Sequence, residues 1–370
     1  MRWLKKFSDS ITVVAFFAIL IMFAVSILFF QGNISFSELK AGADSTIEAC
    51  TEYVEQNFPM RSNWRTMYTN IMICSGKRRF GDTFFTGNRL VRLNDIHSED
   101  KKIENVAHIN ELAANTDRPI YMMLVPTAAG VYSADIPEIS DSRDQRESIN
   151  EAYMQLDKQI ISIDAFYPLY SARDEYVYYR TEDQWTSFGA YYAYTESLKA
   201  LGFSAVTLDN YDQEYADANF KGELYDNLMA SVLEPDRINI FRSKYQSPVT
   251  KVEMFGETEK KEAESVYFRS ALKSSKKTDI FLFGNRYIKT DVYTKLNDAP
   301  KLLIIKGGYA NAILPFYTAH YSKITMVDPN KLKRADMKLS EVVDTDDYDQ
   351  ILVIFDIDSF SSAGYFDTLQ

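Results

Sequence analysis

Histidine is scarce in this chain of 370 residues, which contains only His97, His108 and His320. Thiols are scarcer still, because Cys50 and Cys74 are the only two cysteines and neither stands at metal-ligand spacing from a histidine. We therefore expect no metal site, and nothing in the sequence calls for a cofactor. The two cysteines could pair in an oxidising compartment, but the sequence alone does not place their Cα atoms within bridging distance.

Positive charge is also in short supply, since 41 Lys and Arg face 52 Asp and Glu and give a net charge of −11. Such a chain repels phosphate backbones and anionic lipid unless a basic patch is segregated, and we identify no such patch, so we exclude nucleic acid as a partner. The sequence has no internal repeat, no low-complexity tract and no Walker or G-x-G-x-x-G phosphate-binding motif. Aromatic residues are abundant, with 25 Tyr and 24 Phe; an ordinary core is the favoured interpretation, and a binding surface is the alternative.

One long hydrophobic run stands out, ITVVAFFAILIMFAVSILFF at residues 11–30. At about 1.5 Å rise per residue, about twenty apolar residues in a helix span a hydrocarbon core of about 30 Å. Arg2, Lys5 and Lys6 precede the run, and positive charge marks the cytoplasmic end of such a segment. We therefore predict a single-pass membrane anchor, with everything after it outside the cell.

A cleaved signal peptide is the alternative interpretation of this run, and AGA at residues 41–43 resembles a cleavage site. The run is longer than the usual apolar region of about 7–15 residues in a signal peptide, and AGA lies far beyond its end, so an uncleaved anchor is favoured. Helices broken at Pro59 are expected between residues 50 and 70. The predicted organisation is a cytoplasmic N-terminus (1–10), an anchor (11–30), a polar stalk (31–48) and an extracytoplasmic domain (49–370).

Short apolar runs alternate with helical patterns along the rest of the chain. The segment Ser187–Leu201 has the periodicity of an amphipathic helix, with Thr186 or Ser187 as N-cap and Gly202 as its end. Strands joined by such helices predict an α/β sandwich with a mainly parallel sheet, in which ligands bind beyond the carboxyl ends of the strands. The predicted strands are 120–125, 279–283, 301–305, 324–327 and 351–355.

Four turns at predicted strand ends are candidate site segments. In the extended segment at residue 182, Glu182 and Gln184 point to the same side, because side chains alternate along a strand. A glycine turn before a helix has the geometry of a nucleophile elbow, yet the turn at residue 308 carries no nucleophile. The four turns are Pro126-Thr127, Glu182-Asp183-Gln184-Trp185, Gly284-Asn285 and Gly307-Gly308-Tyr309.

Two of these turns carry a family resemblance. RTEDQWTSFGAYYAY at residues 180–194 and IKGGYANAILPFYTAHY at residues 305–321 resemble the RTDHHWT-GAYYAY and IKDSYANSF-PFL-HY blocks of the DHHW family. The resemblance implies an SGNH-hydrolase-like three-layer sandwich, related to the proteins of alginate O-acetylation. In the DHHW family these two blocks carry a catalytic Asp, His and Ser. Further matches in family order are NFPMRSNW (57–64), MMLVPTAAGVY (122–132), FKGELY (220–225), FGNRYI (283–288) and MVDP (326–329).

This sequence departs from the family pattern at the positions of the catalytic residues. The motif's aspartate is Glu182, its first histidine is Asp183, its second histidine is Gln184, and the serine is Gly308. A carboxamide cannot take up a proton near neutral pH, and glycine has no hydroxyl to acylate. In a serine hydrolase, loss of the serine or the histidine alone lowers turnover by about a millionfold. We therefore expect no catalytic residues and treat Glu182, Gln184 and Gly308 as degenerate catalytic positions.

The neighbouring residues are candidates for binding a ligand, each with a plain structural alternative. The pair Gly307-Gly308 is either a vestigial pocket or only a tight turn, and Trp185 is either a sugar platform or a core anchor. Asn285 either donates to an oxyanion or forms a structural turn, and His320 is a remote candidate for a recruited base. The ligand-binding candidates are Arg180, Asp183, Trp185, Gly284, Asn285, Gly307 and Tyr309.

Three functions remain open. The first is a membrane-anchored pseudoenzyme of the cell envelope that binds a surface polysaccharide or a membrane-bound O-acyltransferase, partners that the resemblance implies. The second is a working esterase or acetyltransferase that uses Glu182 or Asp183 as acid and base. The third is a structural envelope protein whose pocket has collapsed.

Overall fold

The structure is a computed structural model that describes residues 2–29, 40, 46–93, 98–136, 144–245 and 248–370. The chain divides into two compact units. The smaller unit comprises Met1–Lys77 and Leu228–Val232, and the larger comprises Arg78–Asn227 and Leu233–Gln370. Each is described by itself.

The smaller unit contains α1 (Arg2–Phe29), α3 (Thr46–Asn57) and α4 (Arg61–Cys74). The predicted break at Pro59 is present, because Met60 adopts a left-handed conformation with φ 57° before α4 begins. Cys50 and Cys74 are exposed and free, so they form no disulfide.

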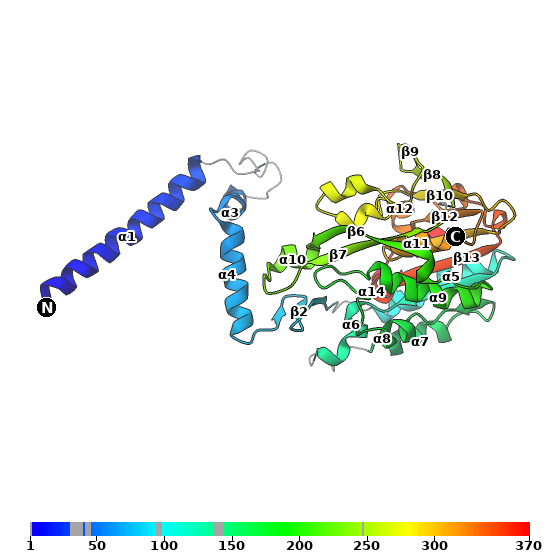
Figure 1. Cartoon of the computed structure of the whole chain (residues 1–370), viewed down its shortest axis with the longest axis horizontal. Helices are drawn as coiled ribbons and strands as arrows, with labels where there is room; N and C mark the ends of the chain where they lie inside the picture. Colours follow the sequence, from blue (N-terminus) through cyan, green and yellow to red (C-terminus); the bar gives the residue numbers. More distant parts are fainter. Residues whose placement is uncertain (1, 30–39, 41–45, 94–97, 137–143, 246–247) are drawn as a thin grey trace. The chain divides into compact units, whose positions relative to one another are not determined.

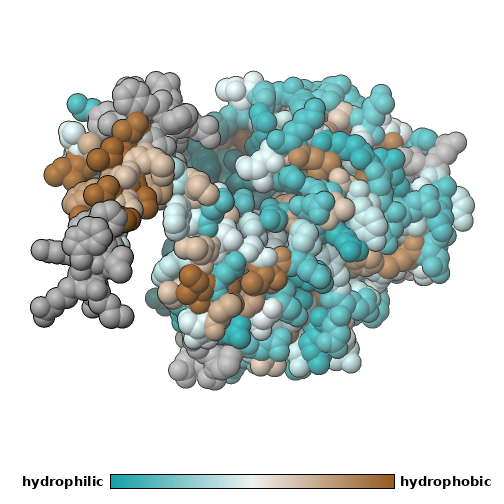
Figure 2. Space-filling model, turned by 60° about the vertical axis from the view of Figure 1, so that its left-hand side comes forward, coloured by the Kyte–Doolittle hydropathy of each residue, from teal (hydrophilic) through white to brown (hydrophobic). Residues whose placement is uncertain are grey.

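The described middle of α1 is hydrophobic and stands out in brown in the space-filling view (Figure 2). Within the residues that the structure describes, no helix meets the length and hydrophobicity that crossing a membrane requires. The anchor expected at residues 11–30 stays a prediction. The expected stalk at residues 31–48 lies mostly outside the described part of the chain, although its last residues begin α3.

An eight-stranded mixed sheet forms the centre of the larger unit (Figure 1). Five neighbouring strands are parallel, and three antiparallel strands extend the sheet at one edge, so the expectation of a mainly parallel sheet holds only for its first five strands. In spatial order the strands are β5 (Ile160–Ser162), β4 (Ile120–Val125), β13 (Gln350–Asp356), β11 (Lys301–Lys306), β12 (Lys323–Val327), β10 (Lys289–Thr294), β8 (Val249–Phe255) and β9 (Lys260–Ala263).

Both faces of this sheet are covered, which makes a three-layer arrangement. Alternate residues of β4 and β13 enter different cores: Met123 and Leu352 belong to one, Met122 and Val353 to the other. The first core includes α9 (Ser187–Leu201) and α11 (Ala310–Tyr317). The second includes α5 (Glu99–Ala114), α7 (Gln145–Met154), α12 (Pro329–Arg334), α13 (Leu339–Val342) and α14 (Ile357–Ser362).

Helix α9 follows directly from its sequence. The hydroxyl of Thr186 accepts hydrogen bonds from the amides of Phe188 (3.2 Å) and Gly189 (3.3 Å), and the helix ends at Gly202 in the left-handed region, as predicted. A Cβ added at Gly189 would lie 2.2 Å from the carbonyl oxygen of Val177, so only glycine lets α9 approach the preceding segment this closely.

Four of the five predicted strands are confirmed as β4, β11, β12 and β13, but the strand expected at 279–283 is wrong. Residues Lys277–Ile280 form a 3-10 helix, and Phe281 makes only an isolated bridge to Tyr267. Leu282, Phe283 and Gly284 then take positive φ values of 56°, 57° and 62°, which a β-strand does not allow.

Several elements were not foreseen from the sequence. The strands β6 (Tyr211–Phe220) and β7 (Asp236–Ser243) form a long antiparallel pair. A small sheet combines β1 (Arg79–Phe80), β2 (Thr83–Phe85) and β3 (Leu90–Arg92). The remaining short helices are α6 (Ala128–Val131), α8 (Phe166–Ser171) and α10 (Glu223–Leu228).

Candidate functional site

The loop that carries Arg180 to Trp185 is fixed by a buried carboxylate, that of Asp236 at the start of β7. Asp236 accepts hydrogen bonds from the amides of Arg180 and Thr181, each at 2.8 Å, from the Thr181 hydroxyl, and from the Tyr176 hydroxyl at 2.5 Å. Hydrogen bonds to a charged acceptor are about twice as strong as neutral ones. The loop therefore has a firm anchor in the core beneath it.

A second loop, from β11 to α11, packs against the first. The amide of Gly307 donates to the carbonyl of Ile354 (2.7 Å), and a Cβ at Gly307 would lie 2.8 Å from the Phe355 ring. The indole of Trp185, only 1 % exposed, donates to the carbonyl of Tyr309 (3.0 Å), and the two rings lie 5.2 Å apart. Trp185 thus joins the two loops from within the core.

These two loops bring Gln184 close to Gly308. A Cβ built at Gly308 would lie 3.9 Å from Nε2 of Gln184 and 3.2 Å from Nδ2 of Asn285. The carboxamide of Gln184 makes no hydrogen bond to any other residue that the structure describes. A group on residue 308, or a ligand in its place, would therefore meet two amide nitrogens.

The orientation of the Asn285 amide is set by its neighbours. Its Oδ1 accepts from Nζ of Lys306 (2.6 Å) and from Nδ2 of Asn311 (2.9 Å), which leaves Nδ2 facing Gly308. Lys306 is buried, and its Nζ lies 3.8 Å from Oδ2 of Asp328. Burial lowers the pKa of Lys306, while Asp328 opposes that effect. This network makes Asn285 a preorganised hydrogen-bond donor.

The turn before Asn285 is strained. Leu282 and Phe283 occupy the left-handed region, which costs an ordinary residue about 1–2 kcal/mol each. Gly284 has a φ of 62°, which favours glycine, and a Cβ there would lie 2.2 Å from Oδ1 of Asp279 and would displace that carboxyl group. Backbone strain of this kind clusters at functional sites, and here it aims the Asn285 side chain.

Glu182 no longer has the geometry to orient a neighbouring base. Its Oε2 accepts from the amide of Glu223 (2.9 Å) and its Oε1 from the amide of Asp183 (3.2 Å). The backbone approaches so closely that a Cβ at Gly222 would lie 2.6 Å from Oε2. Burial raises the pKa of Glu182, and the hydrogen bond from Glu223 counteracts it. Both carboxylate oxygens are bound to backbone amides, and neither bonds Gln184.

Asp183, the residue after Glu182, is mostly buried. Its Oδ2 lies 3.5 Å from Nε of Arg92, and Nη2 of Arg92 donates to Oε1 of Glu223 at 2.9 Å. Burial raises the pKa of Asp183 to about 7; Arg92 opposes the rise, and Asp356 and Asp358 add to it. Asp183 therefore titrates near neutral pH.

A cleft of about 630 Å³ opens at this place. Four of the expected residues line it: Glu182, Gln184, Gly284 and Asn285. The other expected residues do not line it. Gly308 lies beside two lining residues, Gln184 and Asn285, without lining the cleft itself. Trp185, Gly307 and Tyr309 lie in the packed layer, Asp183 pairs with Arg92, and Arg180 is directed at Glu234 (3.7 Å). The other lining residues are Glu223, Asp226, Ser275, Lys276, Thr278, Asp279, Phe281, Phe283, Arg286, Asn311 and Ala312.

The cleft lacks a nucleophile paired with a base. Ser275 and Thr278 supply hydroxyls, but no histidine lines the cleft, and among the residues the structure describes no serine is hydrogen-bonded to a histidine. His320 bonds the Tyr194 hydroxyl (2.7 Å), and burial lowers its pKa to about 4, so it is neutral at pH 7. His97 lies outside the described residues.

A family model described as DHHW protein matches residues 65–327, which is most of the chain. The chain belongs to the DHHW family. No curated protein matches it in sequence. The match spans both loops, the one that carries residues 182–184 and the one that carries Gly308.

Solved structures show the same fold for this DHHW protein. A DHHW family protein from Eubacterium siraeum has a TM-score of 0.64 at 20% identity and covers 78% of this chain and 96% of its own. PatB1 from Bacillus cereus, solved with a sulfonyl adduct, has a TM-score of 0.65 at 12% identity, covering 78% and 98%. The O-acetyltransferase domain of Pseudomonas putida AlgJ is less similar, with a TM-score of 0.41 at 14% identity, covering 74% and 87%.

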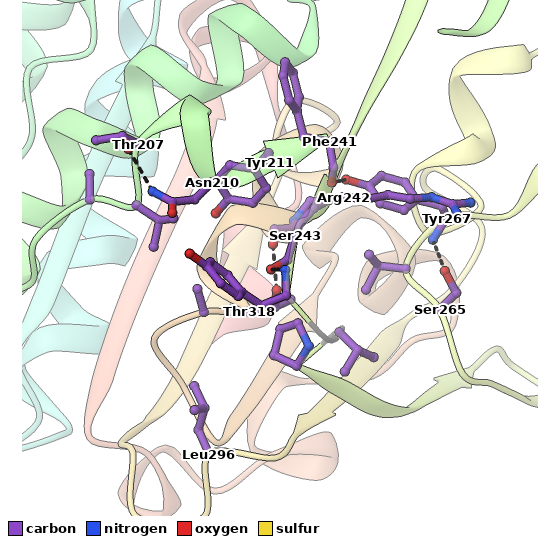
Figure 3. A pocket seen from close by; sticks show the side chains of 18 of the residues that line it. Thr207, Asn210, Tyr211, Phe241, Arg242, Ser243, Ser265, Tyr267, Leu296 and Thr318 are labelled. Carbon is purple, nitrogen blue, oxygen red and sulfur yellow. Dashed lines mark hydrogen bonds between the residues drawn. The ribbon is translucent and has the colours of Figure 1, made fainter. Parts of the chain in front are cut away.

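This DHHW protein has a second, larger cleft of about 980 Å³ on the α11 side of the sheet (Figure 3). Many of its polar groups are already bonded within the protein: the Tyr267 hydroxyl donates to the Phe241 carbonyl (2.7 Å), the Tyr267 amide to Ser265 (3.1 Å), and Asn210 to Thr207 (2.9 Å). It shares no lining residue with the cleft at Gly308, so the motif chemistry does not lie there.

Sequence reasoning missed the residues that support the site of this DHHW protein. Lys306 and Asn311 orient Asn285, Asp236 anchors the other loop, and the amide of Glu223 binds Glu182. Lys306 and Asn311 lie within the IKGGYAN block and Glu223 within FKGELY, so the matched blocks did contain this signal. Asp236 lies outside every quoted block.

Proposed function

We propose that this DHHW protein is a catalytically inactive member of its family that binds an acetylated sugar of a cell-surface polysaccharide in the cleft that Gln184 and Asn285 line beside Gly308. One observation carries the proposal: Gly308 faces the amide nitrogens of Gln184 and Asn285, so donors suited to an acetyl carbonyl are present where no nucleophile stands. Without a hydroxyl or an imidazole, a bound ester stays intact.

The charge of the cleft suggests the kind of glycan. Four carboxylates line it, those of Glu182, Glu223, Asp226 and Asp279, against two cations, Lys276 and Arg286. Carboxylates accept hydrogen bonds from sugar hydroxyls and repel an anionic chain. A neutral, O-acetylated sugar is therefore the proposed ligand. With each hydrogen bond worth about 0.5–1.5 kcal/mol, we expect weak binding that relies on many repeats along a polymer.

The proposal includes a place in the cell. The apolar run at residues 11–30, preceded by Arg2, Lys5 and Lys6, supports a single-pass anchor with the larger unit outside the cytoplasm. An envelope location would bring the cleft to surface polysaccharide and to a membrane-bound O-acyltransferase, the partner that the family's association with O-acetylation suggests.

The binding test compares acetylated and chemically deacetylated forms of one neutral oligosaccharide against the full chain in detergent, by saturation-transfer NMR. We expect transfer to the acetyl methyl group, and its loss in Gln184→Ala, which removes a carboxamide that has no partner within the described chain. Gln213→Ala, at an exposed position of β6, is the matched control. Equal binding of the two forms, or an unaltered Gln184→Ala, would contradict the proposal and favour a structural role.

A working enzyme is the second candidate, and the near-neutral pKa of Asp183 favours it. Hydrolysis of a chromogenic acetate ester by the full chain tests it. Turnover by the wild type that disappears in Glu182→Gln or Asp183→Asn would contradict our proposal and show a working enzyme. We expect none, and expect hydrolysis to appear in the triple variant Gly308→Ser, Glu182→Asp, Gln184→His, because the space at Gly308 admits a side chain once Asn285 shifts by a few tenths of an ångström.

A further inference from the structure

The segment around α4 is positively charged, although the chain as a whole is negatively charged. Between residues 56 and 81 there are five basic residues, three of them at 77–79, and no Asp or Glu, in a chain whose net charge is −11. Our sequence-based view that no basic patch is segregated overlooked this stretch. Two of the five, Arg61 and Arg65, lie in the first turns of α4.

Helix α4 also presents an apolar face to solvent. Trp64, Met67, Tyr68 and Ile71 are 43, 48, 55 and 53% exposed. Their spacing of three, four and seven residues places them within an arc of about 100° on a helix that turns about 100° per residue. We call these four residues the α4 stripe. Large apolar side chains gathered on one helix face mark an interaction surface.

The opposite face of α4 already has its packing partner within the smaller unit. Thr69 and Ile73 are buried, and the Thr69 hydroxyl donates to the carbonyl of Leu228 (2.6 Å). Asn70 donates to the Ser231 hydroxyl (2.7 Å). The α4 stripe therefore lies on the side of the helix that faces away from the Leu228–Val232 segment.

We propose that α4 lies on the surface of an anionic membrane, with the α4 stripe in the headgroup region and Arg61 and Arg65 against lipid phosphates. Aromatic and apolar residues on one face, cations at its edge and the absence of acids are the features of an interfacial helix. On the helical wheel both arginines fall beside the stripe, about 60° and 100° from Trp64. The proposal does not depend on α1 crossing the membrane.

Lipid fits this surface better than a second copy of the chain does. A copy would carry the same cations on the same face, and a two-fold contact would bring like charges together. Each basic residue near an anionic surface contributes about 1 kcal/mol, or about fivefold in partitioning. Reversing Arg61 and Arg65 should therefore weaken the contact by at least about 25-fold.

The test uses Trp64 as its probe in the full chain. Trp3→Phe leaves Trp64 and the buried Trp185, which lipid cannot reach. The protein is mixed with phosphatidylcholine vesicles with or without phosphatidylglycerol, floated, and measured for quenching by brominated acyl chains. We expect quenching in the anionic vesicles that disappears in Trp64→Phe, in Arg61→Glu with Arg65→Glu, and in Met67→Ser with Ile71→Ser.

The control pair is Arg237→Glu with Arg334→Glu, which makes the same charge change at exposed positions of the larger unit and should leave quenching unaltered. Quenching equal in neutral and anionic vesicles, or absence of the chain from floated anionic vesicles, overturns the proposal. Trp64 that becomes shielded from acrylamide in neutral vesicles as protein density rises would instead identify a second copy as the occupant.

Discussion

Replacing Asp183 with Asn should change how the stability of the larger unit depends on pH. Asp183 is only 21% exposed, and burial raises its pKa from 3.8 to about 7 even though Arg92 lies 3.5 Å away. A raised pKa means that the folded state holds the proton more tightly than the unfolded chain does. The stabilisation from that proton is complete below about pH 4 and is lost as the pH rises through about 7.

The size of the effect follows from the shift. About three pKa units correspond to about 4 kcal/mol of unfolding free energy at the most, because one unit is worth about 1.4 kcal/mol. Partial exposure and relaxation reduce this, and we expect a loss of about 2–4 kcal/mol from this group between pH 4 and 8. Asp183→Asn removes this titrating group. The unfolding free energy of the variant should therefore rise by that amount relative to the wild type as the pH increases from 4 to 8.

Urea unfolding of the full chain in detergent, followed by near-ultraviolet circular dichroism at a series of pH values, measures this difference. Asp212→Asn, at an exposed position of β6, is the matched control. The reasoning fails if the stability of Asp183→Asn relative to the wild type does not rise between pH 4 and pH 8. That result would mean that the ion pair with Arg92 outweighs burial and that Asp183 is ionised throughout.

Three further substitutions test the scaffold of the site by shifts in the urea midpoint. Asp236→Ala should lower the unfolding free energy by about 3 kcal/mol or more, because several donors lose a charged acceptor; a loss under 1 kcal/mol would show that the loop does not rely on it. Gly189→Ala should cost at least about 1–3 kcal/mol, since its Cβ would lie 2.2 Å from the Val177 oxygen, and a neutral result would contradict the close approach. Thr186→Ala should cost about 1 kcal/mol by removing the N-cap of α9, with Thr195→Ala on the same helix as control.

The parts of the fold that the sequence predicts are those governed by local patterns. β4, β11 and β13 are continuous apolar runs because both faces of the sheet are covered, and α9 has its cap and its glycine end written at the expected positions. The antiparallel edge was missed although β8, VTKVEMF, alternates in burial as a half-exposed strand does. The run at 279–283 misled because periodicity cannot distinguish a buried turn from a strand.

The sequence allowed us to name several residues of the site, but not to predict how their side chains are oriented. Glu182 and Gln184 do line one cleft, but residues 180–184 form bends and not the extended segment from which we expected this. The family blocks pointed to Gly308, which lies beside Gln184 and Asn285. The orientation of Asn285, however, depends on a left-handed turn and on Lys306 reaching it from another strand, which no local pattern encodes.

The geometry around Asn285 is the strongest physical argument for the proposed binding role. Two features of the site cost free energy: the left-handed turn before Asn285, whose Leu282 also packs in the hydrophobic core, and the burial of the Lys306 amine. Together they hold one amide donor toward Gly308. The ligand that we propose for this geometry accepts a hydrogen bond from this donor and is not attacked, because residue 308 has no hydroxyl.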